Sequence, residues 1–182
     1  MVKVKILENK LTKVLNIRTQ KDYPKKGIEF IDIMPLIIEK EIFNEIIDKF
    51  VKEIKEKDVD YIVGPEARGF LIGTAIASKL KLGFIPVRKK GKLPPTTIEK
   101  EFNYEKEYGK DVLVLPKLVN DTYKNKKFYI VDDIMATGNT INAIKLAIEK
   151  LDGNVVGTGV ILDIDELNKK DDLFSLIKVN EE

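Results

Sequence analysis

The chain is organised around the segment Lys127-Phe-Tyr-Ile-Val-Asp-Asp-Ile-Met-Ala-Thr-Gly-Asn-Thr140. Residues 128–131 form an unbroken apolar run, which is typical of a parallel strand buried on both faces. Asp132 and Asp133 follow this run directly, and a small, hydroxyl-bearing turn comes next at 136–140. Apolar residues then recur at the spacing of a helix, at Ile141, Ile144, Ile148 and Leu151. The stretch therefore predicts a strand, an acidic pair, a small-residue loop and a helix, in this order.

This order of elements places polar chemistry at one edge of a sheet. In an open parallel sheet ligands bind beyond the carboxyl ends of the strands, and a helix N-terminus presents free N–H groups to a phosphate. Gly138 lets the backbone come close to a ligand, while Thr137 and Thr140 add hydroxyl donors. Asp132 and Asp133 can accept hydrogen bonds from sugar hydroxyls or help to hold a hydrated Mg²⁺ ion. The alternative is that the two aspartates only end a strand and cap a helix.

The segment Val131–Thr140 resembles the phosphoribosyl-pyrophosphate (PRPP) loop of the type I phosphoribosyltransferases. The resemblance implies that Asp132 and Asp133 hold the ribose hydroxyls. It also implies that the loop cradles the 5′-phosphate, with Ala136, Thr137, Gly138, Asn139 and Thr140 as its members. The family usually has Gly where Asn139 stands. We therefore expect a positive φ at Asn139, because Asn is the non-glycine residue that tolerates it best.

A second strand-loop-helix pattern lies upstream. Residues 59–63 are predicted to form a buried strand and residues 71–80 a helix, with Gly64-Pro-Glu-Ala-Arg-Gly-Phe70 between them. This heptapeptide resembles the pyrophosphate-binding loop of the family, which assigns Glu66, Ala67 and Arg68 to the pyrophosphate and makes Arg68 one of two expected catalytic residues. As an alternative, Arg68 is a surface residue paired with Glu66, an interaction worth about 0–1 kcal/mol.

A third strand, predicted at 83–87, leads into the basic loop Arg88-Lys-Lys-Gly-Lys-Leu-Pro94. Four cations within five residues repel one another unless an anion is present. The loop resembles its counterpart in the adenine phosphoribosyltransferases, and the resemblance implies that Arg88, Lys89 and Lys92 bind pyrophosphate. A solvated basic turn or a nucleic-acid patch is the alternative.

The segment 24–33 is predicted to form a turn followed by an extended piece, and a plain edge hairpin would show the same pattern. It also resembles the hood of the adenine phosphoribosyltransferases, in which a Phe stacks on the base. The resemblance makes Phe30 this aromatic residue and assigns Glu29 and Ile134 to the adenine site as well. Glu29 and Ile31 depart from the usual hood pattern, so a purine other than adenine stays open as the substrate.

The polar segment 96–111 is long for a plain connection, and long loops in enzymes are often lids. In the family a flexible flap, here about residues 92–112, covers the site. Its Glu-Tyr-Gly motif matches Glu107-Tyr108-Gly109. The resemblance implies that Glu107 is a catalytic residue for proton transfer at the purine and that Tyr108 closes over PRPP. A β-hairpin with surface aromatic residues is the alternative.

The composition limits the remaining possibilities. The 182 residues, 43% of them hydrophobic, fit one domain with a core of its own, and the net charge of +2 gives no global reason to expect nucleic acid or a membrane. Cys and His are both absent, which excludes disulfides, thiolate catalysis and Cys or His metal ligands. Neither a signal peptide nor a membrane span of about 20 apolar residues is evident, which predicts a cytoplasmic protein. Periodicity further predicts helices at 2–17 and 36–54, and strands at 112–115, 154–162 and 174–179.

Together the motifs predict an α/β fold like that of the type I phosphoribosyltransferases: an open, mainly parallel sheet flanked by helices, with a small N-terminal hood at about 20–35 and a flexible flap. The resemblance implies a purine-salvage enzyme that transfers the phosphoribosyl group of PRPP to adenine, giving AMP and pyrophosphate. It also implies a homodimer and a Mg²⁺ cofactor without a direct protein ligand, which Asp132 and Asp133 would contact through water. Two alternatives stay open: a phosphoribosyltransferase for xanthine, hypoxanthine or guanine, and a non-catalytic PRPP-sensing regulatory protein.

Overall fold

The computed structural model describes residues 18–23, 26, 29–106, 109–164 and 173–178. The helix predicted at 2–17 lies outside these residues, as do Glu107 and Tyr108. Two sheets are present in the described residues: a seven-stranded sheet in the order β5-β6-β4-β3-β7-β8-β9 and a two-stranded sheet, β1-β2. The strands are β1 Arg18–Lys21, β2 Glu29–Asp32, β3 Tyr61–Pro65, β4 Gly83–Lys89, β5 Ile98–Lys106, β6 Gly109–Pro116, β7 Lys127–Met135, β8 Asn154–Asp163 and β9 Leu173–Lys178. The helices are α1 Met34–Ile38, α2 Lys40–Lys55, α3 Arg68–Leu80 and α4 Asn139–Glu149, with a short 3₁₀ helix, η2, at Pro95–Thr97.

The centre of the large sheet is parallel. β3 pairs in parallel with β4 and β7, and β8 pairs in parallel with β7 and β9. β5 and β6 form an antiparallel hairpin, and β6 adds this hairpin to β4. The apolar run at 128–131 in β7 is fully buried, as expected for a central parallel strand. The predicted open, mainly parallel sheet is therefore confirmed.

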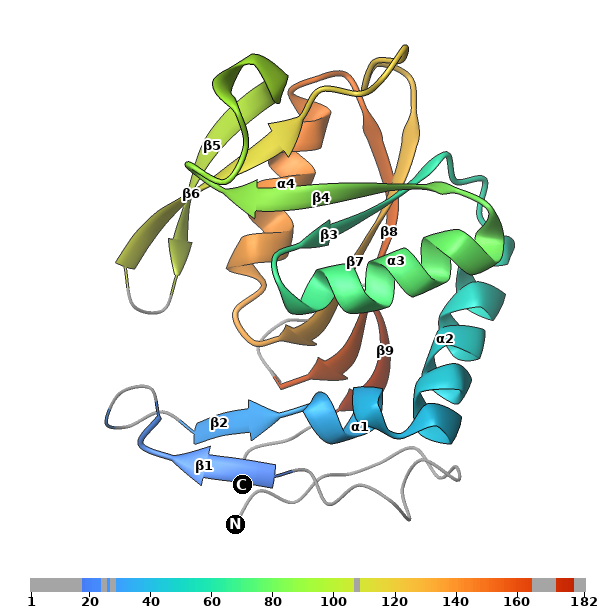
Figure 1. The fold of residues 1–182 in the computed structure, drawn as a ribbon, viewed down its shortest axis with the longest axis vertical. Helices are drawn as coiled ribbons and strands as arrows, with labels where there is room; N and C mark the ends of the chain where they lie inside the picture. Colours follow the sequence, from blue (N-terminus) through green and yellow to red (C-terminus); the bar gives the residue numbers. More distant parts are fainter. Residues whose placement is uncertain (1–17, 24–25, 27–28, 107–108, 165–172, 179–182) are drawn as a thin grey trace.

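Helices cover both faces of this sheet (Figure 1). α2 and α3 pack on one face, where Phe50, Ile72 and Tyr129 belong to one buried cluster. α4 packs on the other face, where Phe128 and Ile144 belong to a second cluster. The Tyr129 ring needs space in the neighbouring strand, because a Cβ at Gly157 would come within 2.5 Å of a ring carbon.

The segment predicted as one helix at 36–54 is two helices, so this prediction was wrong in one respect. α1 ends at Ile38 and α2 begins at Lys40, and Glu39 between them has an extended backbone with ψ 106°. The apolar pairs continue with nearly unbroken spacing across Glu39, so periodicity alone does not show the break. Pro35, in the first turn of α1, marks where the helical segment begins.

Several predicted elements have different ends in the structure. β7 continues to Met135 instead of ending at Val131, because the residues after Val131 pair with β8. β4 continues to Lys89, and α3 begins at Arg68, three residues before its predicted start. The strand predicted at 112–115 is the longer β6, whereas α4 ends at Glu149 and leaves Leu151 outside the helix.

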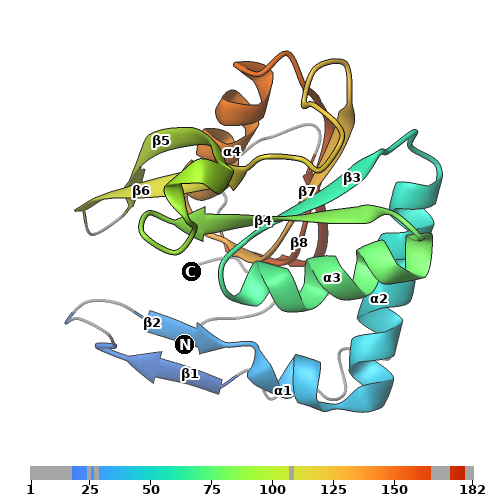
Figure 2. The same cartoon turned by 45° about the horizontal axis from the view of Figure 1, so that its top comes forward.

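Two hairpins extend toward one side of the molecule. Figure 2 shows the β1-β2 hairpin and the β5-β6 hairpin reaching toward the side on which β4 ends and α3 begins. In the described part of the segment 96–111, η2 leads into β5, and β5 pairs with β6 in antiparallel fashion. Movement of this segment as a flap stays a prediction. No helix of the described residues is long and apolar enough to cross a membrane.

Candidate active site

Three loops meet at the carboxyl edge of the parallel strands. β3 lies between β4 and β7, so the segments that follow these strands begin side by side. Two close contacts join them. Arg68, after β3, lies 2.8 Å from Asp133 of β7, and Arg88 of β4 lies 3.0 Å from Glu66, after β3. The structure therefore brings together residues that the sequence assigned to one site from three separate motifs.

Arg68 and Asp133 form an ion pair at the start of α3. The Arg68 Nε atom lies 2.8 Å from Oδ2 of Asp133, with the carboxylate side chain 5% exposed and the arginine side chain 39% exposed. Within the described part of the chain, no N–H or O–H group points correctly at this oxygen to form a hydrogen bond. Asp133 is thus neutralised by a nearby cation, while a lone pair of its buried oxygen can still accept a hydrogen bond from a ligand.

Asp132 is held close to Asp133 and is electrostatically strained. Its Oδ1 atom accepts a hydrogen bond from the backbone N–H of Asp133 at 2.9 Å. Burial raises the pKa of the Asp132 carboxyl well above its usual range, the charge of Asp133 raises it further, and Arg68 opposes the shift. Gly69 allows the start of α3 to lie close to the ends of β3 and β7. A Cβ at this position would lie 2.8 Å from Cδ of Pro65 and 3.2 Å from Oδ1 of Asp132. Carboxyl groups with pKa values raised in this way cluster at functional sites, which makes the acidic pair a candidate for one.

The loop after β7 forms a cradle at the start of α4. Ala136, Thr137 and Gly138 connect the two elements, and Asn139 is the first helical residue, followed by Thr140. Gly138 has the left-handed φ of 71°, so the positive φ expected at Asn139 lies one residue earlier. Asn139 is the first residue of α4 and has a helical backbone, so the left-handed turn lies at Gly138, directly before the helix. The N–H of Asn142 is bonded to the carbonyl of Gly138, which leaves the first N–H groups of α4 without helical partners and available to an anion.

The basic loop begins inside β4. Arg88 and Lys89 are its last strand residues and pair with β6, while Lys89 and Lys92 are exposed. Arg88 Nε donates to Oε2 of Glu66 at 3.0 Å. Lys90 pairs instead with Glu101 of β5 at 2.8 Å, so one of the four cations is compensated by the hairpin.

The ion pairs differ from the alternative that the sequence offers, in which Arg68 pairs with Glu66. In the described residues Glu66 pairs with Arg88 and Arg68 pairs with Asp133. The parallel register explains the first pair, because Pro65 is opposite Val87 and the residues that follow each of them are neighbours.

The hood reaches this site through Arg68. The ring centroid of Phe30, in β2, lies 5.9 Å from Cζ of Arg68. The rings of Tyr23 and Phe30 pack edge to face, with their centroids 5.3 Å apart. Sequence reasoning missed Tyr23, whose signal was an aromatic residue directly before the Pro24 turn. Glu29 lies beside Phe30 in β2, whereas Ile134 is half-buried in β7 and packs against the core.

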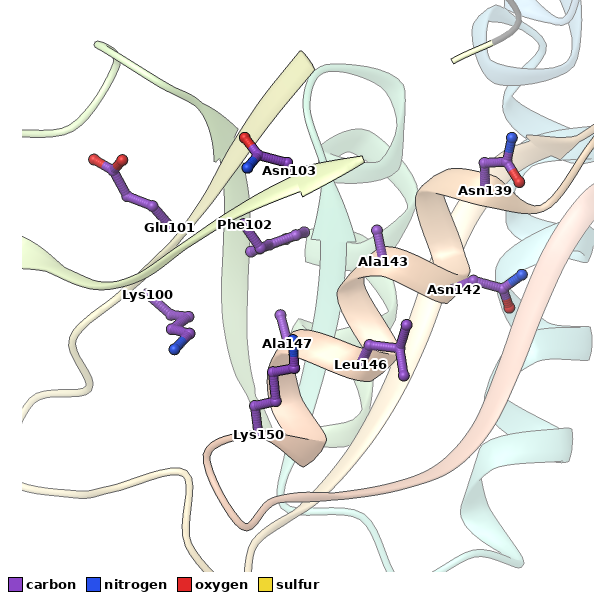
Figure 3. A pocket seen from close by; sticks show the side chains of 10 residues that line it. All are labelled: Lys100, Glu101, Phe102, Asn103, Asn139, Asn142, Ala143, Leu146, Ala147 and Lys150. Carbon is purple, nitrogen blue, oxygen red and sulfur yellow. The ribbon is translucent and has the colours of Figure 1, made fainter. Parts of the chain in front are cut away.

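A groove of about 550 Å³ lies between β5 and α4, next to the loop 136–140 (Figure 3). Phe102 points from β5 toward Ala143 of α4, and Lys150 lies at the far end of the helix. Of the predicted site residues within the described ranges, Asn139 alone lines the groove. The groove and the site at the carboxyl edge are therefore separate features.

Comparison with known proteins identifies the class to which this fold and site belong. The model of the phosphoribosyl transferase domain matches residues 37–180, and the chain belongs to this family.

Its relatives carry a more particular name. The adenine phosphoribosyltransferase of Clostridium acetobutylicum is 45% identical over 170 residues, covering 91% of this chain and 96% of the relative. The crystal structure of the adenine phosphoribosyltransferase of Thermoanaerobacter pseudethanolicus is 38% identical, with a TM-score of 0.83 over 92% of this chain and 99% of that one. The Saccharomyces cerevisiae enzyme, solved with adenine and an imino-altritol bisphosphate, is 34% identical, with a TM-score of 0.78 over 91% and 97% of the two chains.

Proposed function

We propose that this chain is a purine-salvage enzyme that transfers the phosphoribosyl group of PRPP to adenine, giving AMP and pyrophosphate. The observation that carries the proposal is the position of Arg68, which contacts the hood aromatic Phe30 and the buried carboxylate of Asp133. A base beneath the hood would thus adjoin a ribose held at the acidic pair. The relatives named adenine phosphoribosyltransferase, similar over nearly the whole chain, support adenine as the base.

The ribose and its phosphate would bind at the end of β7. Asp132 and Asp133 accept hydrogen bonds from the ribose hydroxyls, which the lone pairs of buried Asp133 Oδ2 support. The 5′-phosphate sits on the cradle 136–140, where the first N–H groups of α4 and the hydroxyls of Thr137 and Thr140 surround it. These groups contribute positioning, so that C1′ of the sugar faces the base.

The cations of the two other loops would stabilise the leaving group. The bond between C1′ and pyrophosphate breaks through a sugar with oxocarbenium character, and negative charge gathers on the departing pyrophosphate. Four side chains neutralise this charge: Arg68, Arg88, Lys89 and Lys92. The backbone of Ala67 belongs to the same segment after β3 as Arg68. As part of the proposal, the flap excludes water from the oxocarbenium-like sugar, and Tyr108 closes over PRPP. Glu107 transfers the proton at the base.

The residues present fit a Mg²⁺ ion that arrives with PRPP. In the described ranges no three acidic side chains lie close enough together to hold a metal ion. Mg²⁺ commonly keeps several waters and binds through one or two carboxylates plus substrate phosphates, a role open to Asp132 and Asp133. When bound, the ion adds positive charge at the pyrophosphate oxygens.

The hood would complete the base site. Phe30 stacks on the purine, with Glu29 and Ile134 as its expected neighbours. A homodimer and a cytoplasmic location also belong to the proposal through the family resemblance, and light scattering of the purified protein measures the first.

The test is a turnover assay with PRPP and Mg²⁺, in which adenine, hypoxanthine, guanine and xanthine are offered in parallel and nucleotide is quantified. We expect AMP from adenine and at most trace product from the other bases. Product from another purine would overturn the adenine assignment but keep the mechanism. Retained PRPP binding without any product would instead support the regulatory alternative, for which a gel shift with random DNA is the next assay.

A further inference from the structure

Glu66 is tied to the neighbouring strand by both its backbone and its side chain. Its N–H donates to the carbonyl of Val87 at 2.9 Å, and its Oε2 atom accepts from Nε of Arg88 at 3.0 Å. The glutamate side chain is 14% exposed and the arginine side chain 35% exposed. The carboxylate is therefore fixed between β3 and β4 at the entrance of the basic loop.

A carboxylate in this position has the wrong chemistry for a direct pyrophosphate contact. Ionised Glu accepts hydrogen bonds and donates none, and pyrophosphate is also an acceptor with negative charge. Placed against each other, the two groups would repel. A favourable contribution of the ionised Glu66 side chain to pyrophosphate binding therefore has to pass through a cation, and Arg88 is the cation that lies 3.0 Å from it.

Arg88 is the residue through which it can act. A guanidinium carries five N–H donors in a rigid plane, and Glu66 uses the one on Nε. Within the described part of the chain, Glu66 is the sole ion-pair partner of Arg88. Fixing Nε orients the whole plane and leaves the four N–H groups on its two terminal nitrogens for an anion.

We infer that Glu66 is a positioning residue that holds the Arg88 guanidinium ready for the leaving pyrophosphate, and that its negative charge limits how tightly the free product is retained. This inference rests on the proposed phosphoribosyl transfer, with pyrophosphate as leaving group. It makes Glu66 a partner of Arg88 and not a ligand of the substrate. Two effects follow, one on the use of PRPP and one on the release of pyrophosphate.

The experiment compares Glu66→Gln, Glu66→Ala, Arg88→Ala and the double variant Glu66→Ala/Arg88→Ala. Glu66→Gln keeps an oxygen that accepts from Arg88, so kcat/KM for PRPP should stay within about 3-fold of wild type, whereas Glu66→Ala should lower it about 10- to 100-fold. The double variant should be no worse than Arg88→Ala, because the two residues act as one unit. Glu66→Gln should also bind pyrophosphate more tightly, seen as stronger product inhibition.

Glu149→Ala, at an exposed position on α4, is the matched control and should behave as wild type, and thermal melts check that every variant folds. Independent, multiplying losses from Glu66→Ala and Arg88→Ala would overturn the inference, as would a Glu66→Gln variant that is as impaired as Glu66→Ala or that binds pyrophosphate more weakly. Failure of the proposed function is distinguishable, because the wild-type protein itself would then form no AMP.

Discussion

Removal of Arg68 should separate a loss of stability from a loss of activity. Arg68→Ala leaves the Asp133 carboxylate, 5% exposed, without the cation that now lies 2.8 Å away. Removing one partner of a buried ion pair costs about 3–5 kcal/mol, but Arg68 is 39% exposed and solvent screens the pair. We therefore expect a loss of about 1–3 kcal/mol, which for a chain of this length lowers Tm by about 2–10 °C.

The second variant, Arg68→Ala/Asp133→Asn, removes the stranded charge as well. Its Tm should recover most of the loss, because an amide is far less costly to bury than an unpaired carboxylate. Its kcat/KM for PRPP should stay at least about 100-fold below wild type, since the proposal places Asp133 on the ribose and Arg68 on the leaving pyrophosphate. Thermal melts and steady-state AMP formation measure the two effects. An Arg68→Ala variant as stable as wild type, or a double variant as unstable as the single one, would show that Arg68 does not stabilise the buried Asp133 carboxylate.

Three further predictions concern neighbouring residues. Burial raises the pKa of Asp132, so the ionised carboxylate destabilises the folded state, and Asp132→Asn should raise Tm near pH 8. In melts at falling pH this gain in Tm should disappear toward the unfolded-state pKa of about 3.9. The same variant should lose turnover. Phe30→Leu should raise KM for adenine about 5- to 100-fold and leave KM for PRPP unchanged in initial-rate kinetics, because base stacking is worth about 1–3 kcal/mol. Lys90→Ala should change kcat/KM for PRPP less than about 3-fold, whereas Lys89→Ala should lower it about 10-fold, since Lys90 only forms an exposed pair with Glu101; equal losses would contradict this difference.

Local sequence patterns predict the order of the elements in this chain, but not where each one ends. The buried apolar run at 128–131 and the helical spacing to Ile148 correspond to β7 and α4. The end of β7 at Met135 depends on its pairing with β8, in which Ile134 is opposite Leu162. The break at Glu39, where the backbone is extended, likewise leaves no mark in the apolar pattern.

The members of the candidate site were predictable, but their partners were not. Each motif lies within a few residues of sequence, so residue types and spacing identify it. The pairing of Glu66 with Arg88 spans two strands and follows from their parallel register, which a single segment does not contain. The edge-on contact of Tyr23 with Phe30 likewise accompanies the antiparallel pairing of β1 with β2, which a single segment does not contain. The roles of Glu107 and Tyr108 stay predictions.

In the proposed function, one edge of the parallel sheet assembles the whole phosphoribosyl site. The most direct test is a crystal structure of the protein with AMP and pyrophosphate. We expect the 5′-phosphate of AMP on residues 136–140, the ribose hydroxyls on Asp132 and Asp133, the base under Phe30, and pyrophosphate at Arg68 and Arg88. A nucleotide bound in the groove between β5 and α4, or a phosphate away from the start of α4, would contradict it.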